Sequence, residues 1–277
     1  MALAGALTAA AHAVRPRVAG KFLRAGEDKL WIKGVTYGTF RPGADGGDYP
    51  AQAVLERDFA AMAASGINAV RVYTVPPRSL LDEAQRHGLR VMVGLPWEQH
   101  IAFLDVPGRA ADIEARVRAG VRQCAGHPAL LAYSVGNEIP PAIVRWHGRR
   151  RIERFVRRLY DAAKAEDPDA LVTYVNFPTT EYLLLPFLDF VCFNVYLEAR
   201  ERLEAYLARL QNLAGERPLV MAEIGLDSRR NGEAAQAESI GWQVRTACAA
   251  SPLRRESRPI SAITSGRSPA RFCSRAR

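Results

Sequence analysis

Short runs of β-branched and other apolar residues alternate along the chain with longer stretches in which apolar residues recur every three or four positions. The short runs are typical of buried parallel strands, and the longer stretches are typical of amphipathic helices that cross back between them. The predicted strands are residues 32–38, 67–73, 89–95, 129–138, 171–175, 190–196 and 218–224. The predicted helices are residues 51–64, 78–87, 109–124, 149–165, 180–185, 201–213 and 232–249.

Seven strand–helix units in this order predict an α/β fold, the (β/α)8 TIM barrel, in a chain of 277 residues. A β-hairpin, with strands at 18–23 and 29–32, is expected to cover the bottom of the barrel. An eighth strand should follow the last helix, but Ser, Arg and Pro dominate that stretch. We therefore expect the eighth strand to be missing or degenerate. The predicted organisation is a disordered leader at 1–17, the barrel at 18–250 and a disordered basic tail at 251–277.

The net charge of +9 is concentrated at one end of the chain. The last 27 residues carry seven Arg and one Glu, a net +6, so about +3 is left for the other 250 residues. The barrel itself is therefore weakly charged, which argues against a nucleic-acid partner. No apolar run is long enough to span a bilayer. The leader lacks the charged and apolar regions of a signal peptide, which favours a cytoplasmic location without fixing it.

Two carboxylates end predicted strands that lie three units apart along the chain. Asn137-Glu138 ends the fourth strand, and Glu223 ends the seventh. Active sites of such barrels lie at the carboxyl ends of the strands, so both side chains should enter one cavity. Hydrolysis of a glycoside requires two carboxyl groups, one on each side of the scissile bond. The pattern therefore indicates a glycosidase with a carbohydrate substrate, and we expect no cofactor and no metal.

The residues around these strand ends resemble the clan of retaining (β/α)8 glycosidases. The matching stretches are KGVTYG, NAVRVY, GNE, FNVY and MAEIG. The resemblance implies that Glu138 is the acid/base and Glu223 the nucleophile of a double displacement on a β-linked glycoside. It also implies that Arg71 and Tyr196 support the nucleophile. Within the clan, the opening is similar both to the β-galactosidase/β-glucuronidase family and to β-1,3-glucanosyltransferases.

Further side chains near the strand ends are candidates for contact with the sugar. Asn137 is expected to bind the sugar 2-hydroxyl, and Trp97 is expected to offer a stacking face for a pyranose ring. Tyr37 is a further substrate-binding candidate. Trp146 and His147 are candidates for the rim of the site.

Other functions stay open on the sequence alone. Transfer of the glycosyl group to a sugar acceptor would use the same residues as hydrolysis. A non-catalytic carbohydrate-binding barrel, or a fragment of a larger polysaccharide-processing protein, would fit the missing eighth strand. A phosphate-binding metabolic barrel is disfavoured, because Glu223-Ile224-Gly225 offers one glycine and a carboxylate that repels phosphate. The oligomeric state is not indicated.

Overall fold

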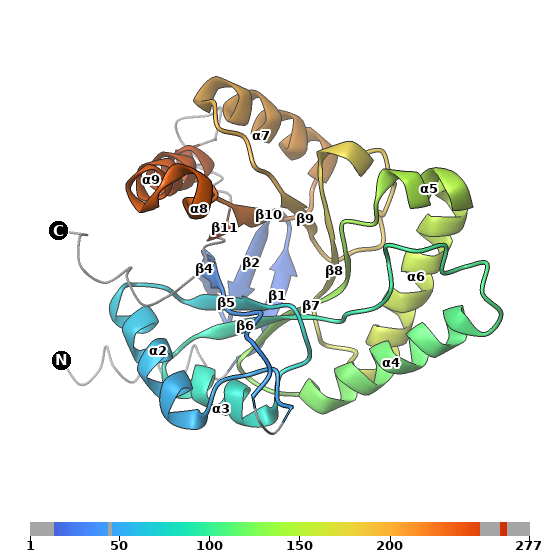
Figure 1. Cartoon of the computed structure of the whole chain (residues 1–277), viewed down its shortest axis with the longest axis horizontal. Helices are drawn as coiled ribbons and strands as arrows, with labels where there is room; N and C mark the ends of the chain where they lie inside the picture. Colours follow the sequence, from blue (N-terminus) through green and yellow to red (C-terminus); the bar gives the residue numbers. More distant parts are fainter. Residues whose placement is uncertain (1–13, 44–45, 250–260, 265–277) are drawn as a thin grey trace.

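Eight parallel strands form a closed barrel in the computed structural model, which describes residues 14–43, 46–249 and 261–264 (Figure 1). The TIM-barrel prediction is therefore confirmed. Each strand pairs with the next along the chain, and the last pairs with both the seventh and the first. The barrel strands are β4 (Lys33–Thr36), β5 (Ala69–Val72), β6 (Arg90–Gly94), β7 (Leu130–Asn137), β8 (Val172–Asn176), β9 (Val191–Asn194), β10 (Leu219–Ile224) and β11 (Ser261–Thr264).

Helices cover the outside of the barrel, and the long ones begin and end within two residues of their predicted bounds. A predicted helix at 180–185 is instead a single 3-10 turn, η1 (Pro178–Thr180). The short helices α5 and α8 have too few residues to show a helical period, and the sequence pattern did not predict them. The helices are α2 (Gln52–Ala64), α3 (Arg78–Arg86), α4 (Arg109–Cys124), α5 (Pro141–His147), α6 (Arg149–Glu166), α7 (Arg200–Ala214), α8 (Ser228–Asn231) and α9 (Glu233–Ala249).

The eighth barrel strand exists, which corrects the expectation that it is missing and that 251–277 are disordered throughout. β11 pairs in parallel with β10 on one side and with β4 on the other. Ile263 of β11 is fully buried and lies so close to Gly34 that a Cβ on that glycine would be 2.8 Å from Ile263 Cγ1. The strand escaped the sequence pattern because only four residues form it and two of them are Ser261 and Ala262. The rest of the predicted tail lies outside the described residues.

The N-terminal sheet has three antiparallel strands rather than the predicted hairpin: β1 (Pro16–Ala19), β2 (Phe22–Ala25) and β3 (Asp28–Lys29). Its first strand includes the last two residues of the predicted leader, and residues 1–13 lie outside the described part of the chain. Leu23 of this sheet is buried with Leu171 and Phe190, which immediately precede β8 and β9. The sheet therefore covers the amino-terminal end of the barrel, as expected, and leaves the carboxyl ends of the strands open.

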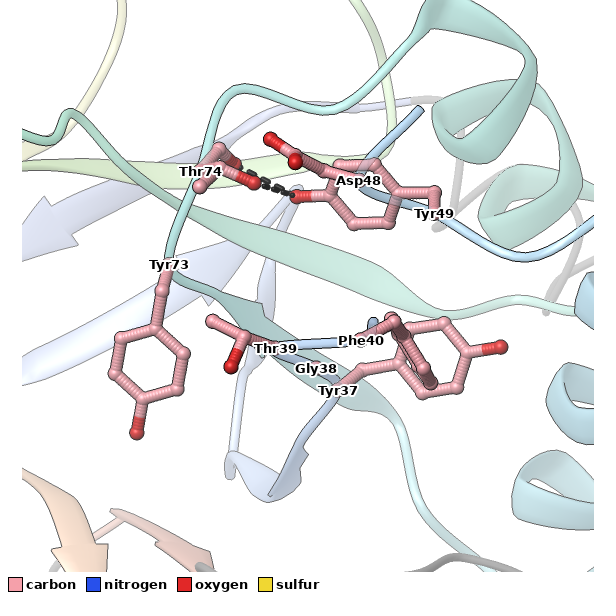
Figure 2. A pocket seen from close by; sticks show the side chains of 8 residues that line it. All are labelled: Tyr37, Gly38, Thr39, Phe40, Asp48, Tyr49, Tyr73 and Thr74. Carbon is pink, nitrogen blue, oxygen red and sulfur yellow. Dashed lines mark hydrogen bonds between the residues drawn. The ribbon is translucent and has the colours of Figure 1, made fainter. Parts of the chain in front are cut away.

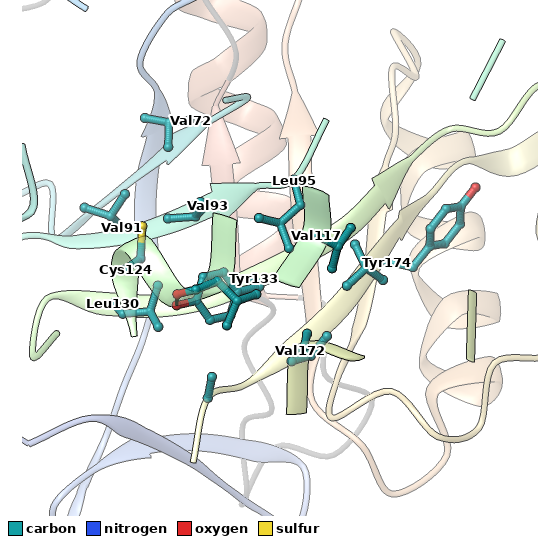
Figure 3. Close-up of a cluster of buried hydrophobic side chains, with 14 of the residues drawn as sticks. Val72, Val91, Val93, Leu95, Val117, Cys124, Leu130, Tyr133, Val172 and Tyr174 are labelled. Carbon is teal, nitrogen blue, oxygen red and sulfur yellow. Dashed lines mark hydrogen bonds between the residues drawn. The ribbon is translucent and has the colours of Figure 1, made fainter. Parts of the chain in front are cut away.

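The largest hydrophobic cluster lies between the strands and the outer helices (Figure 3). Val117 and Cys124 of α4 pack there against side chains of β6, β7 and β8. Tyr133 of β7 is fully buried, and its hydroxyl donates a hydrogen bond to the carbonyl oxygen of Val121 at 3.1 Å. This cluster holds β7 firmly against α4, so the strand has a rigid base below the residues that end it.

Candidate active site

Both carboxylates of the sequence prediction stand where the parallel register of their strands is interrupted. In β10 the pairing with β9 shifts between Met221 and Glu223. In β7 the pairing with β8 shifts between Ser134 and Asn137, directly before Glu138. Irregularities of this kind redirect side chains at the ends of strands and are common beside active sites. The sequence places the two glutamates at strand ends, and the interrupted register turns them toward the barrel mouth.

Glu223 accepts hydrogen bonds from three side chains. Arg71 Nη1 donates to Oε1 at 2.7 Å, and the Tyr73 hydroxyl donates to the same oxygen at 2.9 Å. The Tyr196 hydroxyl donates to Oε2 at 2.5 Å. The guanidinium of Arg71 is 2% exposed, so its ion pair with Glu223 is largely shielded from water. Charge-assisted and hydroxyl donors of this kind fix the direction of the carboxylate's oxygens.

Glu138 has a different environment. Burial, the largest effect, raises the pKa of its carboxyl group above the ordinary value, and the negative charge of Glu223 raises it further. Asn194 Nδ2 donates a hydrogen bond to Oε1 of Glu138 at 2.5 Å. Among the described residues other than glycine, Glu138 alone has a positive φ, at 50°. Such backbone strain persists only where surrounding structure holds it, and it is concentrated at functional sites.

A continuous hydrogen-bond network connects the two carboxylates. Arg71 donates to Glu223, to Asn194 Oδ1 at 3.3 Å and to Asn137 Oδ1 at 2.7 Å. Asn194 Nδ2 in turn donates to Asn137 Oδ1 at 3.2 Å as well as to Glu138. Four barrel strands, β5, β7, β9 and β10, thus contribute to one cluster. The structure brings together five of the predicted site residues: Arg71, Asn137, Glu138, Tyr196 and Glu223.

Three members of this network were not predicted as site residues. Tyr73 directly follows β5 and Asn194 ends β9, and this position at a strand end was the available signal. Gln99, in the loop after β6, accepts a hydrogen bond from the backbone N–H of Asn137 at 2.9 Å. Nothing in the local sequence marks Gln99, because its role depends on a contact with a residue 38 positions away.

Two predicted substrate contacts are corrected by the structure. Trp97 is 8% exposed, packs edge-on against Phe103, and donates its indole N–H to the carbonyl oxygen of Val135 at 2.8 Å. Tyr37 is 1% exposed, and its hydroxyl donates to Asp58 at 3.0 Å. Both rings are too deeply buried to stack on a sugar, although Tyr37 also belongs to the lining of the pocket at the ends of β4 and β5. The sequence could not distinguish a large aromatic ring in the core from one above it.

The two candidates for the rim of the site, Trp146 and His147 on α5, differ in exposure. His147 is buried, and its ring packs against Phe103. Trp146 is exposed, and its indole N–H donates to Asp105. The helix therefore has one side chain that anchors it to the loop after β6 and one that faces solvent.

A pocket opens beside the nucleophile candidate, at the ends of β4 and β5 (Figure 2). Tyr73 lines it and also donates to Glu223, so the pocket adjoins the carboxylate cluster. Figure 2 shows the phenol of Tyr73 pointing away from Tyr49, whose hydroxyl bonds to Thr74. The lining residues are Tyr37, Gly38, Thr39, Phe40, Asp48, Tyr49, Tyr73 and Thr74.

Neither a metal-binding cluster nor a membrane-spanning helix occurs in the described part of the chain. Over residues 14–43, 46–249 and 261–264, no three His, Cys, Asp or Glu side chains are grouped so that they could bind a metal ion. None of the helices formed by these residues combines the length and the apolar character that a membrane-spanning helix needs.

Residues 28–241 match the model of the family described as "Glycosyl hydrolases family 2, TIM barrel domain". The chain belongs to this family. The match covers both carboxylates and the strands that carry their hydrogen-bond partners. Membership agrees with the resemblance to the β-galactosidase/β-glucuronidase type of barrel. No curated protein matches the sequence significantly.

Solved structures with a similar fold include β-glucuronidases. The enzyme of Bacteroides uniformis gives a TM-score of 0.72 at 18% identity, over 90% of this chain and 32% of that one. The Ruminococcus gnavus enzyme in complex with uronic deoxynojirimycin gives 0.70 at 16% identity, over 90% of this chain and 45% of that one. At these identities the likeness concerns the fold. This family 2 barrel spans about a third to a half of the length of those proteins.

Proposed function

We propose that this family 2 barrel is a retaining β-glycosidase in which Glu138 is the acid/base and Glu223 the nucleophile. The observation that carries the proposal is the contrast between the two linked carboxyl groups. One accepts hydrogen bonds from a buried arginine and two tyrosines, and the other is held partly buried with a raised pKa. A pair of carboxyl groups with separated protonation states is what acid-assisted displacement at an anomeric carbon requires.

In the first step, an ionised Glu223 oxygen attacks the anomeric carbon and forms a glycosyl ester. The protonated Glu138 gives its proton to the glycosidic oxygen as the bond to the leaving group breaks. Neutralisation of Glu223 in the ester removes the negative charge that helps to raise the pKa of Glu138. In the second step, Glu138 therefore acts as a base on a water molecule, which attacks the anomeric carbon and releases Glu223.

The surrounding network supports these roles. Arg71 and Tyr73 both donate to Oε1 of Glu223, whereas Tyr196 donates to Oε2. Because both oxygens are fixed, the carboxylate presents a defined lone pair to the sugar, which lowers the entropy lost on reaching the transition state. Asn137 is tied by its Oδ1 to Arg71 and Asn194, so its Nδ2 is the group that would donate to a 2-hydroxyl.

Hydrolysis of aryl β-glycosides by the wild-type protein and by Glu223→Ala tests the proposal. We expect the variant to lose kcat by about 10⁴-fold or more. Azide should restore turnover and yield the α-glycosyl azide, because the small anion occupies the space of the missing carboxylate. Glu98→Ala is the matched control, since that glutamate is exposed and pairs with Arg116; it should keep full activity. Inactivity of the wild type toward a broad panel of sugars would refute the proposal.

Glu138→Ala tests the second role. We expect its rate loss to grow as the leaving group becomes a poorer one, because an acid matters most when the departing oxygen is basic. Azide should rescue this variant with the β-glycosyl azide as product, since the covalent intermediate still forms. A rate loss that is the same for all leaving groups would contradict the acid role. Adding a sugar acceptor to the same assay distinguishes hydrolysis from transfer, because transfer yields a new glycoside of the acceptor.

A further inference from the structure

Trp146, in the last turn of α5, is 71% exposed. Of the four tryptophans in the chain, Trp97 is buried and the other two, at 31 and 242, are partly buried. An indole ring gains stability from burial, so one left in water is a candidate for contact with a ligand. Its N–H donates to Asp105 Oδ2 at 2.5 Å, and this bond fixes the orientation of the exposed ring.

The loop after β6 anchors this arrangement from several sides. Arg151 donates to Asp105 Oδ1 at 3.3 Å and to the carbonyl oxygen of Leu104 at 2.8 Å. The backbone N–H of Leu104 donates to His147 Nε2 at 3.5 Å, next to Trp146. A ring held in place before it binds loses little conformational entropy on binding. The exposed indole is therefore a rigid aromatic surface.

The strand order places the pocket of Figure 2 and the helix that carries Trp146 at different sectors of the barrel mouth. The pocket is at β4 and β5, which the strand order places across the barrel from β8 and β9. α5 begins three residues after Glu138 and lies beside η1, which follows β8 (Figure 1). Chain geometry allows at most about 18 Å between the Cα atoms of Glu138 and Trp146. Several sugar units joined in a chain can cover such a distance.

We propose that Trp146 is a binding subsite for the leaving-group side of a β-linked glycan chain. The assignment of sides rests on the proposed function, in which Glu138 protonates the leaving group. A β-linked pyranose has an apolar face of C–H groups that can stack on an aromatic ring, and its hydroxyls reach polar neighbours. Arginines at 145 and 149–151, close to Trp146 in the chain, are also exposed, and their guanidinium groups can donate hydrogen bonds to sugar hydroxyls.

Indole fluorescence provides a binding test that does not depend on catalysis. The probes are hexasaccharides of β-1,3-linked glucose and of β-1,4-linked glucose, xylose and mannose. We expect at least one hexasaccharide to change the emission of the wild-type protein, and that change to be lost in Trp146→Ala. Trp146→Phe, which keeps an aromatic face, should retain most of the affinity when binding is measured by titration calorimetry. If none of the four hexasaccharides gives a change that depends on Trp146, the subsite does not exist.

Kinetics provide the second test. With the hexasaccharide that binds best, Trp146→Ala should lower kcat/KM by about tenfold, through KM, which corresponds to about 1.4 kcal/mol. Hydrolysis of an aryl β-monoglycoside should be unchanged, because that substrate does not reach α5. Leu213→Ala, an exposed apolar side chain on α7, is the control and should leave both activities unchanged.

The two tests separate this subsite from the catalytic proposal. An equal loss on the short and long substrates would overturn the subsite while leaving the catalytic proposal intact. A fluorescence response in a protein that hydrolyses no aryl glycoside would keep the subsite as a glycan-binding surface and overturn the catalytic proposal.

Discussion

The two glutamates at the barrel mouth have opposite surroundings. On the β10 side, Glu223 is surrounded by donors, one of them a buried cation. On the β7 side, Glu138 is partly desolvated and receives one hydrogen bond from a neutral amide. Desolvation favours a neutral carboxyl group, and donors favour an ionised one. The proposed roles of acid/base and nucleophile therefore follow from the surroundings of each glutamate and not from its residue type.

Among the variants considered, Arg71→Leu should have the largest effect on the protein, because it removes the buried cation beside Glu223. It removes the cation from a buried ion pair and takes one hydrogen-bond donor away from each of Glu223 and Asn137. We expect a loss of about 3–5 kcal/mol in the free energy of unfolding, measured by urea denaturation. Arg116→Leu is the matched control, because its pair with Glu98 is exposed and contributes about 1 kcal/mol or less. Equal losses for the two variants would show that burial gives the Arg71 pair no special weight.

Tyr73→Phe and Tyr196→Phe remove one donor each from the two oxygens of Glu223. We expect kcat/KM to fall by about 100-fold for Tyr73→Phe, since water cannot easily replace a shielded donor. For Tyr196→Phe, whose side chain is 51% exposed, we expect a fall of about tenfold. Steady-state kinetics on one aryl β-glycoside measure both. The reverse order would mean that the exposed tyrosine has the larger role in aligning the nucleophile.

Asn194→Ala tests the surroundings of Glu138. Its hydrogen bond is the effect that most lowers the pKa of Glu138, against the larger raising effect of burial. Loss of this bond should therefore raise the pKa of Glu138 further. The alkaline limb of the kcat/KM profile, where the acid loses its proton, should move to higher pH. An alkaline limb that stays in place, or moves to lower pH, would mean that another group controls it.

Local patterns in the sequence predicted seven of the eight barrel strands, the long helices and the pair of strand-ending glutamates. They could do so because the periods of buried strands and amphipathic helices, and the residues that follow them, are local properties of the chain. Glu138 and Glu223 were predictable for that reason, whereas the roles expected of Arg71 and Tyr196 came from the resemblance to retaining (β/α)8 glycosidases. The family match supports the same barrel.

Features that depend on contacts between residues far apart in the chain could be recognised only in the tertiary structure. β11 becomes a strand because β10 and β4 both offer it unpaired backbone groups, although its own four residues carry little strand signal. Trp97 and Trp146 are both aromatic residues near strand ends, yet packing buries the first and exposes the second. Asn194 joins the site through contacts with residues 56 and 57 positions away. Closure of the barrel creates these contacts, so no local pattern in the sequence can contain them.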